Sequence, residues 1–211
     1  ILVGDSMGMV IYGQKNTLSV TKEMMIEHGK AVVNSTKKAL VVIDLPFGSY
    51  ENSKKRAFKV SSEILSKTGA SAVKLEGGIE LADTIKFLVD RGIPVMGHIG
   101  LMPQRINIKG KFISQGHSSL EVKKIITDAK SISSAGVFSI VVEAVKESLG
   151  KKITSSVSVP TIGIGAGKYC DGQILVTDDM LGLSGFYPKF VKKYANLNRL
   201  IEKATEKYTR D

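Results

Sequence analysis

The sequence predicts an α/β fold of the (β/α)8 class, a TIM barrel, in a single domain spanning residues 1–211. Short apolar runs rich in Val and Ile alternate with longer amphipathic stretches, which is typical of βα units around a parallel sheet. Five of the runs end in an ionisable residue, and the C-terminal strand ends of such barrels form the rim that carries chemistry. At 43% hydrophobic and 24% charged residues, the 211-residue chain can bury a full core.

The pattern defines seven strands and five helices, which is one strand fewer than a closed barrel needs. Strands are expected at residues 1–5, 39–45, 72–77, 94–99, 139–143, 160–164 and 173–177. Helices are expected near residues 21–34, 53–68, 79–91, 119–135 and 145–156. Gly69, Gly92 and Gly136 follow helical stretches and are expected as C-caps. Because a closed barrel needs eight strands and the chain begins inside one, we expect the N-terminal strand and helix of the barrel to be missing.

Two stretches fall outside this alternation. Leu101–Ser119 contains Pro103, Gly110 and Gly116 and is expected to be irregular rather than helical. Both a lid over the site and an ordinary packed excursion are open for it. The Pro188–Arg210 stretch is expected to form basic helices.

Composition argues against several classes of partner. The net charge is +10, but the lysines are scattered singly and in pairs, and aromatic residues make up only 6% with no Trp. A solvated lysine-rich surface is therefore favoured over nucleic-acid binding, with steering of an anionic substrate as the alternative. No run approaches the roughly 18 apolar residues of a membrane span, and no signal segment opens the chain. Cys170 is the single cysteine, so a reducing, cytoplasmic location is expected.

The polar residues at the ends of the apolar runs indicate a cation site. Asp5, Asp44, Glu76 and Glu143 would bring four carboxylates to one barrel mouth. Carboxylates that close oppose simultaneous ionisation unless a cation compensates them. All-oxygen ligands favour Mg²⁺ over zinc, with manganese or another divalent ion as alternatives. Since side chains alternate along a strand, Lys74 points to the same face as Glu76.

Two glycine motifs admit other interpretations. Gly4-Asp-Ser-Met-Gly8 has the Gly-x-Ser-x-Gly pattern of a nucleophile elbow, and Ser6, Asp44 and His98 follow the hydrolase chain order. A hydrolase would place strands before the elbow and would leave the other charged strand residues unexplained. Ser6 is better interpreted as a hydrogen-bond donor to an anionic substrate. Gly163-Ile-Gly-Ala-Gly167 follows a strand and fits phosphate binding, a tight turn or a close substrate approach.

Taken together, the motifs resemble the ketopantoate hydroxymethyltransferase family. The matching segments run in family order from the first residue nearly to the last: Val3-Gly-Asp-Ser-Met-Gly8, Asp44-Leu-Pro-Phe47, Val73-Lys-Leu-Glu-Gly-Gly78, Gly97-His-Ile-Gly-Leu-Met-Pro-Gln104, Val142-Glu143, Ile162-Gly-Ile-Gly-Ala-Gly167, Asp171-Gly-Gln-Ile-Leu-Val176 and Pro188-Lys-Phe190. The resemblance implies a barrel of the phosphoenolpyruvate/pyruvate superfamily.

The resemblance also implies a role for each site residue. It places Mg²⁺ at Asp5, Asp44 and Glu76, directly or through water. The 2-oxo acid substrate is expected at Asp5, Ser6, Asp44 and Lys74, with His98 also in the substrate site. Glu143 falls at the position of the proton acceptor of the family.

The reaction that the resemblance implies is hydroxymethyl transfer in pantothenate biosynthesis. The one-carbon donor would be 5,10-methylenetetrahydrofolate, the acceptor 3-methyl-2-oxobutanoate and the product 2-dehydropantoate. The family forms homo-oligomers, commonly decamers, so a homo-oligomer is expected. The alternatives are another Mg²⁺-dependent 2-oxo acid lyase or mutase of the same superfamily, and a non-catalytic ligand-binding barrel.

Overall fold

The computed structural model describes residues 1–110, 113–185 and 187–211, and the chain divides into two compact units, Ile1–Gln173 and Ile174–Asp211. Whether these units are one domain, as expected, stays a prediction. Among the described residues, no helix is long and apolar enough to cross a membrane.

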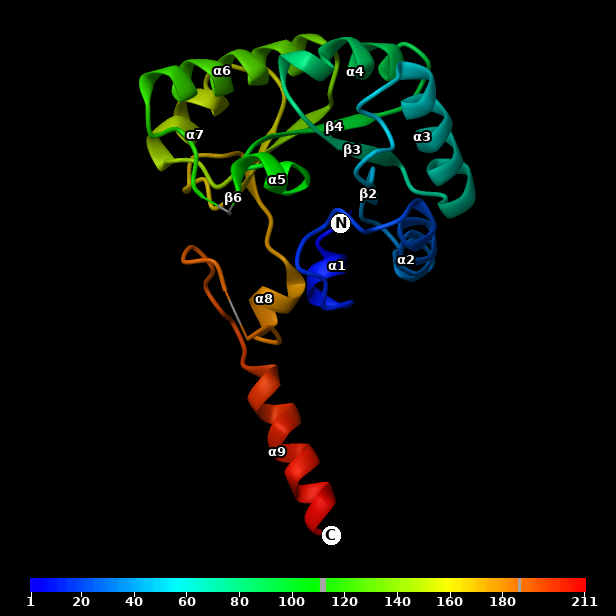
Figure 1. Cartoon of the computed structure of the whole chain (residues 1–211), viewed down its shortest axis with the longest axis vertical. Coiled ribbons are helices and arrows are strands. Elements are labelled where there is room, and N and C mark those ends of the chain that lie inside the picture. The colour runs from blue at the N-terminus through cyan, green and yellow to red at the C-terminus, as the bar shows by residue number, and fades with distance from the viewer. Residues whose placement is uncertain (111–112, 186) are drawn as a thin grey trace. The chain divides into compact units, whose positions relative to one another are not determined.

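The first unit is built on a seven-stranded parallel sheet whose strands lie in chain order (Figure 1). They are β1 (Leu2–Val3), β2 (Val42–Asp44), β3 (Ala72–Glu76), β4 (Val95–Gly100), β5 (Ser139–Glu143), β6 (Thr161–Ile164) and β7 (Gly172–Gln173). The sheet curls, and its outer face is covered by helices, as Figure 1 shows. The α/β barrel-type architecture predicted from the sequence is therefore confirmed. The expected strand and helix before Ile1 stay a prediction.

The helices predicted for this unit are found close to their expected positions, and the structure adds others. Together they are α1 (Met7–Val10), α2 (Lys22–Ser35), α3 (Lys54–Thr68), η1 (Ile79–Leu81), α4 (Ala82–Val89), η2 (Pro103–Arg105), α5 (Ile106–Lys109), α6 (Ser119–Ser134) and α7 (Glu147–Thr154). Of these, α1, η2 and α5 were not predicted. Thr21, Ser53 and Ser118 cap α2, α3 and α6, each accepting a backbone N–H with its hydroxyl oxygen. Gly69 ends α3 in a left-handed conformation, as predicted.

The core lies between the sheet and these helices. The outward-facing strand residues, among them Ile43, Leu75 and Ile140, are fully buried in one apolar cluster. Helix residues such as Ile64 and Ile132 complete the cluster. The alternating inward-facing positions of the same strands are left to the polar residues of the site.

Five details of the sequence prediction are wrong. The strand expected over 173–177 is only Gly172–Gln173, because its register with β6 lasts two residues before the chain turns into α8 (Thr177–Leu181). The stretch expected to be irregular contains η2 and α5, begun by Pro103 in the first turn of η2, where proline fits a helix. Helix 79–91 is a 3₁₀ turn followed by α4.

The other two errors concern the C-caps of two helices and the helices expected after Pro188. The C-caps of α4 and α6 are Asp90 and Ala135, with Gly92 and Gly136 lying just beyond them. In the second unit only α9 (Leu197–Arg210) of the expected basic helices forms. Residues 188–196 are not helical.

Candidate active site

The predicted site residues lie at the C-terminal ends of neighbouring strands. Asp44 ends β2, and in the parallel register it pairs with Lys74 of β3. Glu76 pairs with His98 of β4, and Glu143 ends β5. Because strand order equals chain order, these strand ends meet on one rim of the sheet.

Lys74 is the buried cation of this cluster. Its Nζ lies 3.1 Å from Asp44 Oδ1 and 3.0 Å from His98 Nδ1. Asp44 Oδ2 accepts a hydrogen bond from the backbone N–H of Asp5 at 3.1 Å. Lys74, Asp44, His98 and Asp5 are each less than 5% exposed. The lysine therefore joins the ends of three strands without access to bulk water.

The contacts of His98 determine its tautomer. A charged lysine amine is only a donor, so Nδ1 must accept from Lys74 and the ring proton lies on Nε2. That nitrogen is 3.2 Å from Glu143 Oε2. Burial, followed by the nearby charge of Lys74, lowers the pKa of His98 below its usual value, which agrees with a neutral ring. The ring thus aims an N–H at Glu143.

Burial and crowding shift the carboxyl groups toward protonation. Burial, together with the charge of Asp44, raises the pKa of Asp5 to about 7. Burial also raises the pKa of Glu76 well above its usual value. For Lys74, burial alone would lower the pKa, but the carboxylates of Asp44 and Glu76 outweigh it and the net pKa is raised. Without a bound cation, ionisation of all three buried carboxyl groups beside a single lysine is therefore disfavoured.

Glu143 differs from the other carboxylates in being partly open. Its side chain is 18% exposed, against 2% for Glu76 and 5% for Asp44. The next residue, Ala144, has a φ of 47°, a left-handed conformation that non-glycine residues rarely adopt. Such outliers cluster at functional sites. Glu143 is thus the carboxylate of the cluster that a substrate can reach.

Ser6 lies beside the buried carboxylates. It precedes α1, and a Cβ placed on Gly4 would lie 3.0 Å from Ser6 Oγ and 3.6 Å from Asp44 Oδ2. The absence of a side chain at Gly4 keeps the space between these two groups open. Within the described residues no hydrogen bond joins Ser6 to His98, so the hydrolase arrangement of Ser6, Asp44 and His98 does not form.

Sequence reasoning missed two buried residues of the site, Gln104 and Tyr50. Gln104 Nε2 donates to Asp5 Oδ2 at 2.8 Å, and its backbone N–H donates to Glu76 Oε2 at 3.0 Å. The hydroxyl of Tyr50 donates to Gln104 Oε1 at 2.6 Å. A signal was present for Gln104, which ends the family-like segment from Gly97, but neither residue lies on a strand.

The donor set suits a hard divalent cation. Among the described residues, no three His, Cys, Asp or Glu side chains stand ready as a complete metal-binding group. Three buried carboxylates nevertheless face one lysine, and Asp44 Oδ1 is a buried oxygen that has the ion pair with Lys74 but no hydrogen bond. A bound cation would satisfy that oxygen and offset the excess negative charge. The residues therefore fit Mg²⁺, and the predicted ligand set stays a prediction.

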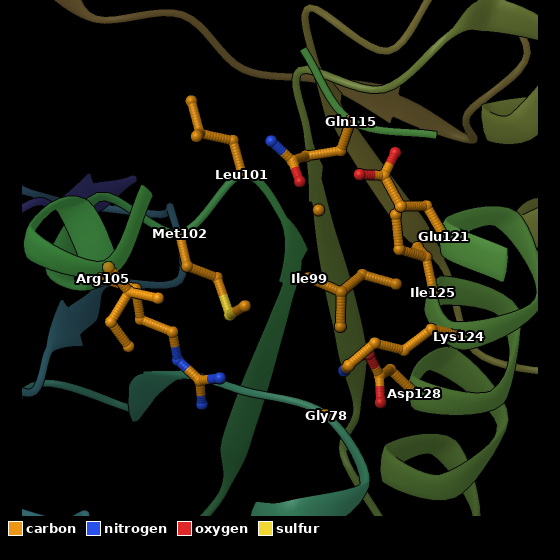
Figure 2. A pocket seen from close by; sticks show the side chains of 12 residues that line it. Gly78, Ile99, Leu101, Met102, Arg105, Gln115, Glu121, Lys124, Ile125 and Asp128 are labelled. Carbon is orange, nitrogen blue, oxygen red and sulfur yellow. The ribbon is translucent and has the colours of Figure 1, made fainter. Parts of the chain in front are cut away.

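A small pocket is lined by other residues than this cluster. Figure 2 shows it between the chain after β4 and helix α6, with Met102, Arg105 and Gln115 on its walls. Its volume is about 140 Å³. The ion pair of Lys124 with Asp128 closes one side. None of the predicted site residues lines it, and it is smaller than the ~300 Å³ of typical ligand sites.

The glycine motif that begins in β6 (Thr161–Ile164) packs tightly and turns after the strand. A Cβ on Gly163 would lie 3.1 Å from Cys170 Sγ, and Gly167 has a φ of 79° against the side chain of Glu147. These contacts favour the tight-turn interpretation among the three that the sequence left open. Residues 111–112 of the stretch interpreted as a lid or a packed excursion lie outside the described residues.

Comparison with solved structures defines the class of the protein. Phosphonopyruvate hydrolase matches with a TM-score of 0.63 at 14% identity, covering 100% of this chain and 73% of that chain. A 2,3-dimethylmalate lyase, a member of the PEP mutase/isocitrate lyase superfamily, matches with a TM-score of 0.60 at 12% identity, covering 99% and 74%. At such identities the likeness shows the fold, which is that of the barrels of this superfamily.

Sequence comparison is more specific. The sequence model for ketopantoate hydroxymethyltransferase matches residues 1–211. The 3-methyl-2-oxobutanoate hydroxymethyltransferase of Paramagnetospirillum magneticum is 54% identical over 209 residues, which cover 99% of this chain and 76% of that protein. The chain belongs to the ketopantoate hydroxymethyltransferase family and is an enzyme, a transferase. The family expected from the sequence is thus confirmed.

Proposed function

We propose that the protein transfers a hydroxymethyl group from 5,10-methylenetetrahydrofolate to 3-methyl-2-oxobutanoate, giving 2-dehydropantoate for pantothenate biosynthesis. The observation that carries this proposal is the partly exposed Glu143, 3.2 Å from His98, beside a cluster of buried carboxyl groups. Family membership supports the same reaction. The folate donor and the 2-oxo acid acceptor are those that the family resemblance implies, and both are part of the proposal.

The carboxylate cluster would hold Mg²⁺. Asp5, Asp44 and Glu76 are the residues that would bind it, and Gln104 occupies only one oxygen each of Asp5 and Glu76, which leaves the other oxygen of each for the ion. When bound, the ion would act as a Lewis acid on the keto group of the substrate and balance the buried negative charge.

Lys74 and Ser6 would recognise the carboxylate of the substrate. A lysine amine has three donors, and that of Lys74 forms an ion pair with Asp44 and a hydrogen bond with His98, so at least one donor remains for a ligand. The hydroxyl of Ser6, beside Asp44, can donate a second hydrogen bond. An anionic 2-oxo acid would thereby be oriented with its C3 toward β5.

Glu143 would act as the general base. Its carboxylate is the accessible one, and His98 Nε2 lies 3.2 Å from Oε2, which leaves the other oxygen to take the C3 proton. Loss of this proton leaves a carbon nucleophile that attacks the methylene carbon of the donor. Both C–N bonds of that methylene break: one is replaced by the new C–C bond and the other by the C–O bond to water. One proton from C3 and one from water go to the two nitrogens, and tetrahydrofolate leaves.

Product analysis tests this reaction. Incubation with both substrates and Mg²⁺ should give 2-dehydropantoate by mass spectrometry, and Glu143→Gln should lower the rate about 100- to 10,000-fold. Glu147→Gln, a change of an exposed glutamate on the following helix, is the matched control and should leave the rate unchanged. If Glu143→Gln kept the parental rate, the assignment of the base would be wrong.

The assembly and location of the protein remain part of this proposal. We propose a homo-oligomer, as expected for the family, and a cytoplasmic enzyme, in agreement with the buried free thiol of Cys170. Size-exclusion chromatography with light scattering tests the assembly.

A further inference from the structure

Helix η2 turns Gln104 away from its neighbours in sequence. Met102 and Arg105 line the small pocket of Figure 2, whereas Gln104 does not. The side chain of Gln104 lies among the strand ends instead and is only 4% exposed. A glutamine buried to this degree must have its amide satisfied by the protein.

The amide of Gln104 has a partner for every hydrogen. Nε2 donates one hydrogen to Asp5 Oδ2 at 2.8 Å and the other to the carbonyl of Leu45 at 2.9 Å. The backbone N–H donates to Glu76 Oε2 at 3.0 Å. One residue therefore binds one oxygen of each of two carboxylates, one in the turn after β1 and the other at the end of β3.

Tyr50 fixes which way the amide points. Its hydroxyl donates to Gln104 Oε1 at 2.6 Å, while the hydroxyl oxygen accepts from the backbone N–H of Glu76 at 3.2 Å. A flipped amide would set Oε1 against the acceptors of Asp5 and Leu45. The network consequently permits a single orientation, with both amide hydrogens directed at acceptors.

We propose that Gln104 is a positioning residue for the divalent cation of this site, an inference that rests on the proposed function. By holding Asp5 Oδ2 and Glu76 Oε2, it directs Asp5 Oδ1 and Glu76 Oε1 toward the ion. Its donated hydrogen bonds also offset the repulsion between the two carboxylates before the ion binds. Tyr50 acts one step further out, by orienting the amide.

Titration of the substrate-free protein with Mn²⁺, followed by the electron paramagnetic resonance signal of free Mn²⁺, tests the proposal without any turnover. Gln104→Met keeps the length of the side chain and removes its donors. It should raise the Kd for Mn²⁺ by about 10- to 100-fold. Gln115→Met is the matched control: Gln115 is also buried, but its amide donates to the carbonyl of Ile113. Its Kd should equal the parental value.

The outcomes separate this inference from the proposed function. Parental binding of Mn²⁺ with an unchanged Kd in folded Gln104→Met would overturn the positioning role and leave the proposed function standing. If the parent itself took up no Mn²⁺, both would fall. A role in folding alone would lower the melting temperature of Gln104→Met and leave its Kd unchanged, which also overturns the proposal.

Tyr50→Phe keeps the test decisive if Gln104→Met does not fold. It removes the hydroxyl that orients the amide and should raise the Kd for Mn²⁺ about fivefold, the effect of one hydrogen bond. An unchanged Kd in folded Tyr50→Phe together with an unfolded Gln104→Met would count against the proposal.

Discussion

Lys74 sets the charge balance of the site as a single buried residue. Its amine bridges Asp44 and His98 within 3.1 Å, and the side chain is 4% exposed. Taking a lysine out of water is costly, so its partners must hold it. The neighbouring carboxylates raise its pKa despite burial, which keeps it charged.

Removal of this charge should destabilise the protein strongly. Lys74→Met leaves Asp44 buried without its counter-charge and should reduce the free energy of unfolding by about 3–5 kcal/mol in urea denaturation. Lys86→Met, which breaks an exposed pair with Asp90, should cost less than ~0.5 kcal/mol. Equal losses in the two variants would contradict the view that the charge of Lys74 is needed where it lies.

At the residue scale, the sequence predicts the site where a regular period applies. Strand alternation places Lys74 and Glu76 on one face, and both are found within 3.6 Å of His98 Nδ1. Gln104 and Tyr50 follow no such period because they lie on connecting segments. The fold alone brings them into the cluster, across 54 residues of sequence.

At the scale of elements, the end of β4 fixes the position of Glu143. Gly100 pairs with Glu143 in the register, and the N–H of Leu101 donates to the carbonyl of Glu143 at 2.9 Å. Gly100 has a φ of 93°, and a Cβ on it would lie 2.3 Å from that carbonyl oxygen. Any side chain there must push the two strand ends apart.

Gly100→Ala should therefore impair catalysis as well as folding. Displacement of Glu143 by about 1 Å would lower the rate of proton removal from the substrate up to about 100-fold. Gly92→Ala is the matched control, since Gly92 has a φ of 83° but open space around it. It should cost about 1–2 kcal/mol of stability from backbone strain and leave the rate unchanged. Loss of rate in both variants would mean that strain, not contact with Glu143, is responsible.

Elements were predicted well where the chain pairs with neighbours on both sides and poorly at its margins. Strands β2 to β5 are paired on both edges, and their outward-facing positions are apolar and buried. Ile174-Leu-Val176 has the same composition, yet it continues no strand, because β7 pairs with β6 only through Gly172 and Gln173. Local composition cannot show where a sheet stops.

At the scale of the whole molecule, the strand order explains why distant residues form one site. The strands follow the chain order in a single parallel sheet, so every strand ends at the same rim. Sequence positions from Asp5 to Glu143 thereby contribute neighbouring side chains. This rim concentrates buried negative charge, and the stability of the molecule should depend on pH.

Asp5 should make the protein less stable as pH rises when no divalent cation is present. Its pKa is about 7 in the folded protein and 3.8 ordinarily, so the folded state holds a proton that the unfolded chain has lost between these values. The stabilisation is present below pH 4 and is lost as pH rises through 7. Asp5→Asn should therefore gain stability relative to the parent across this range, by at most ~4 kcal/mol.

Urea denaturation in EDTA at pH 4 to 8 measures this difference, and comparison with the parent cancels the opposite effect of His98. Asp83→Asn, a change of an exposed carboxylate, should show a constant difference from the parent. A constant difference for Asp5→Asn would show that Asp5 is ionised alike in the folded and unfolded states.

The central claim is that Glu143 removes the C3 proton of a 2-oxo acid at a cation-dependent site. Deuterium exchange at C3 of 3-methyl-2-oxobutanoate, followed by NMR in D₂O with no folate present, tests it most directly. We predict exchange by the parent with Mg²⁺, and its loss both in EDTA and in Glu143→Gln. Absence of exchange by the folded parent with Mg²⁺, or exchange that persists in Glu143→Gln, would contradict the account.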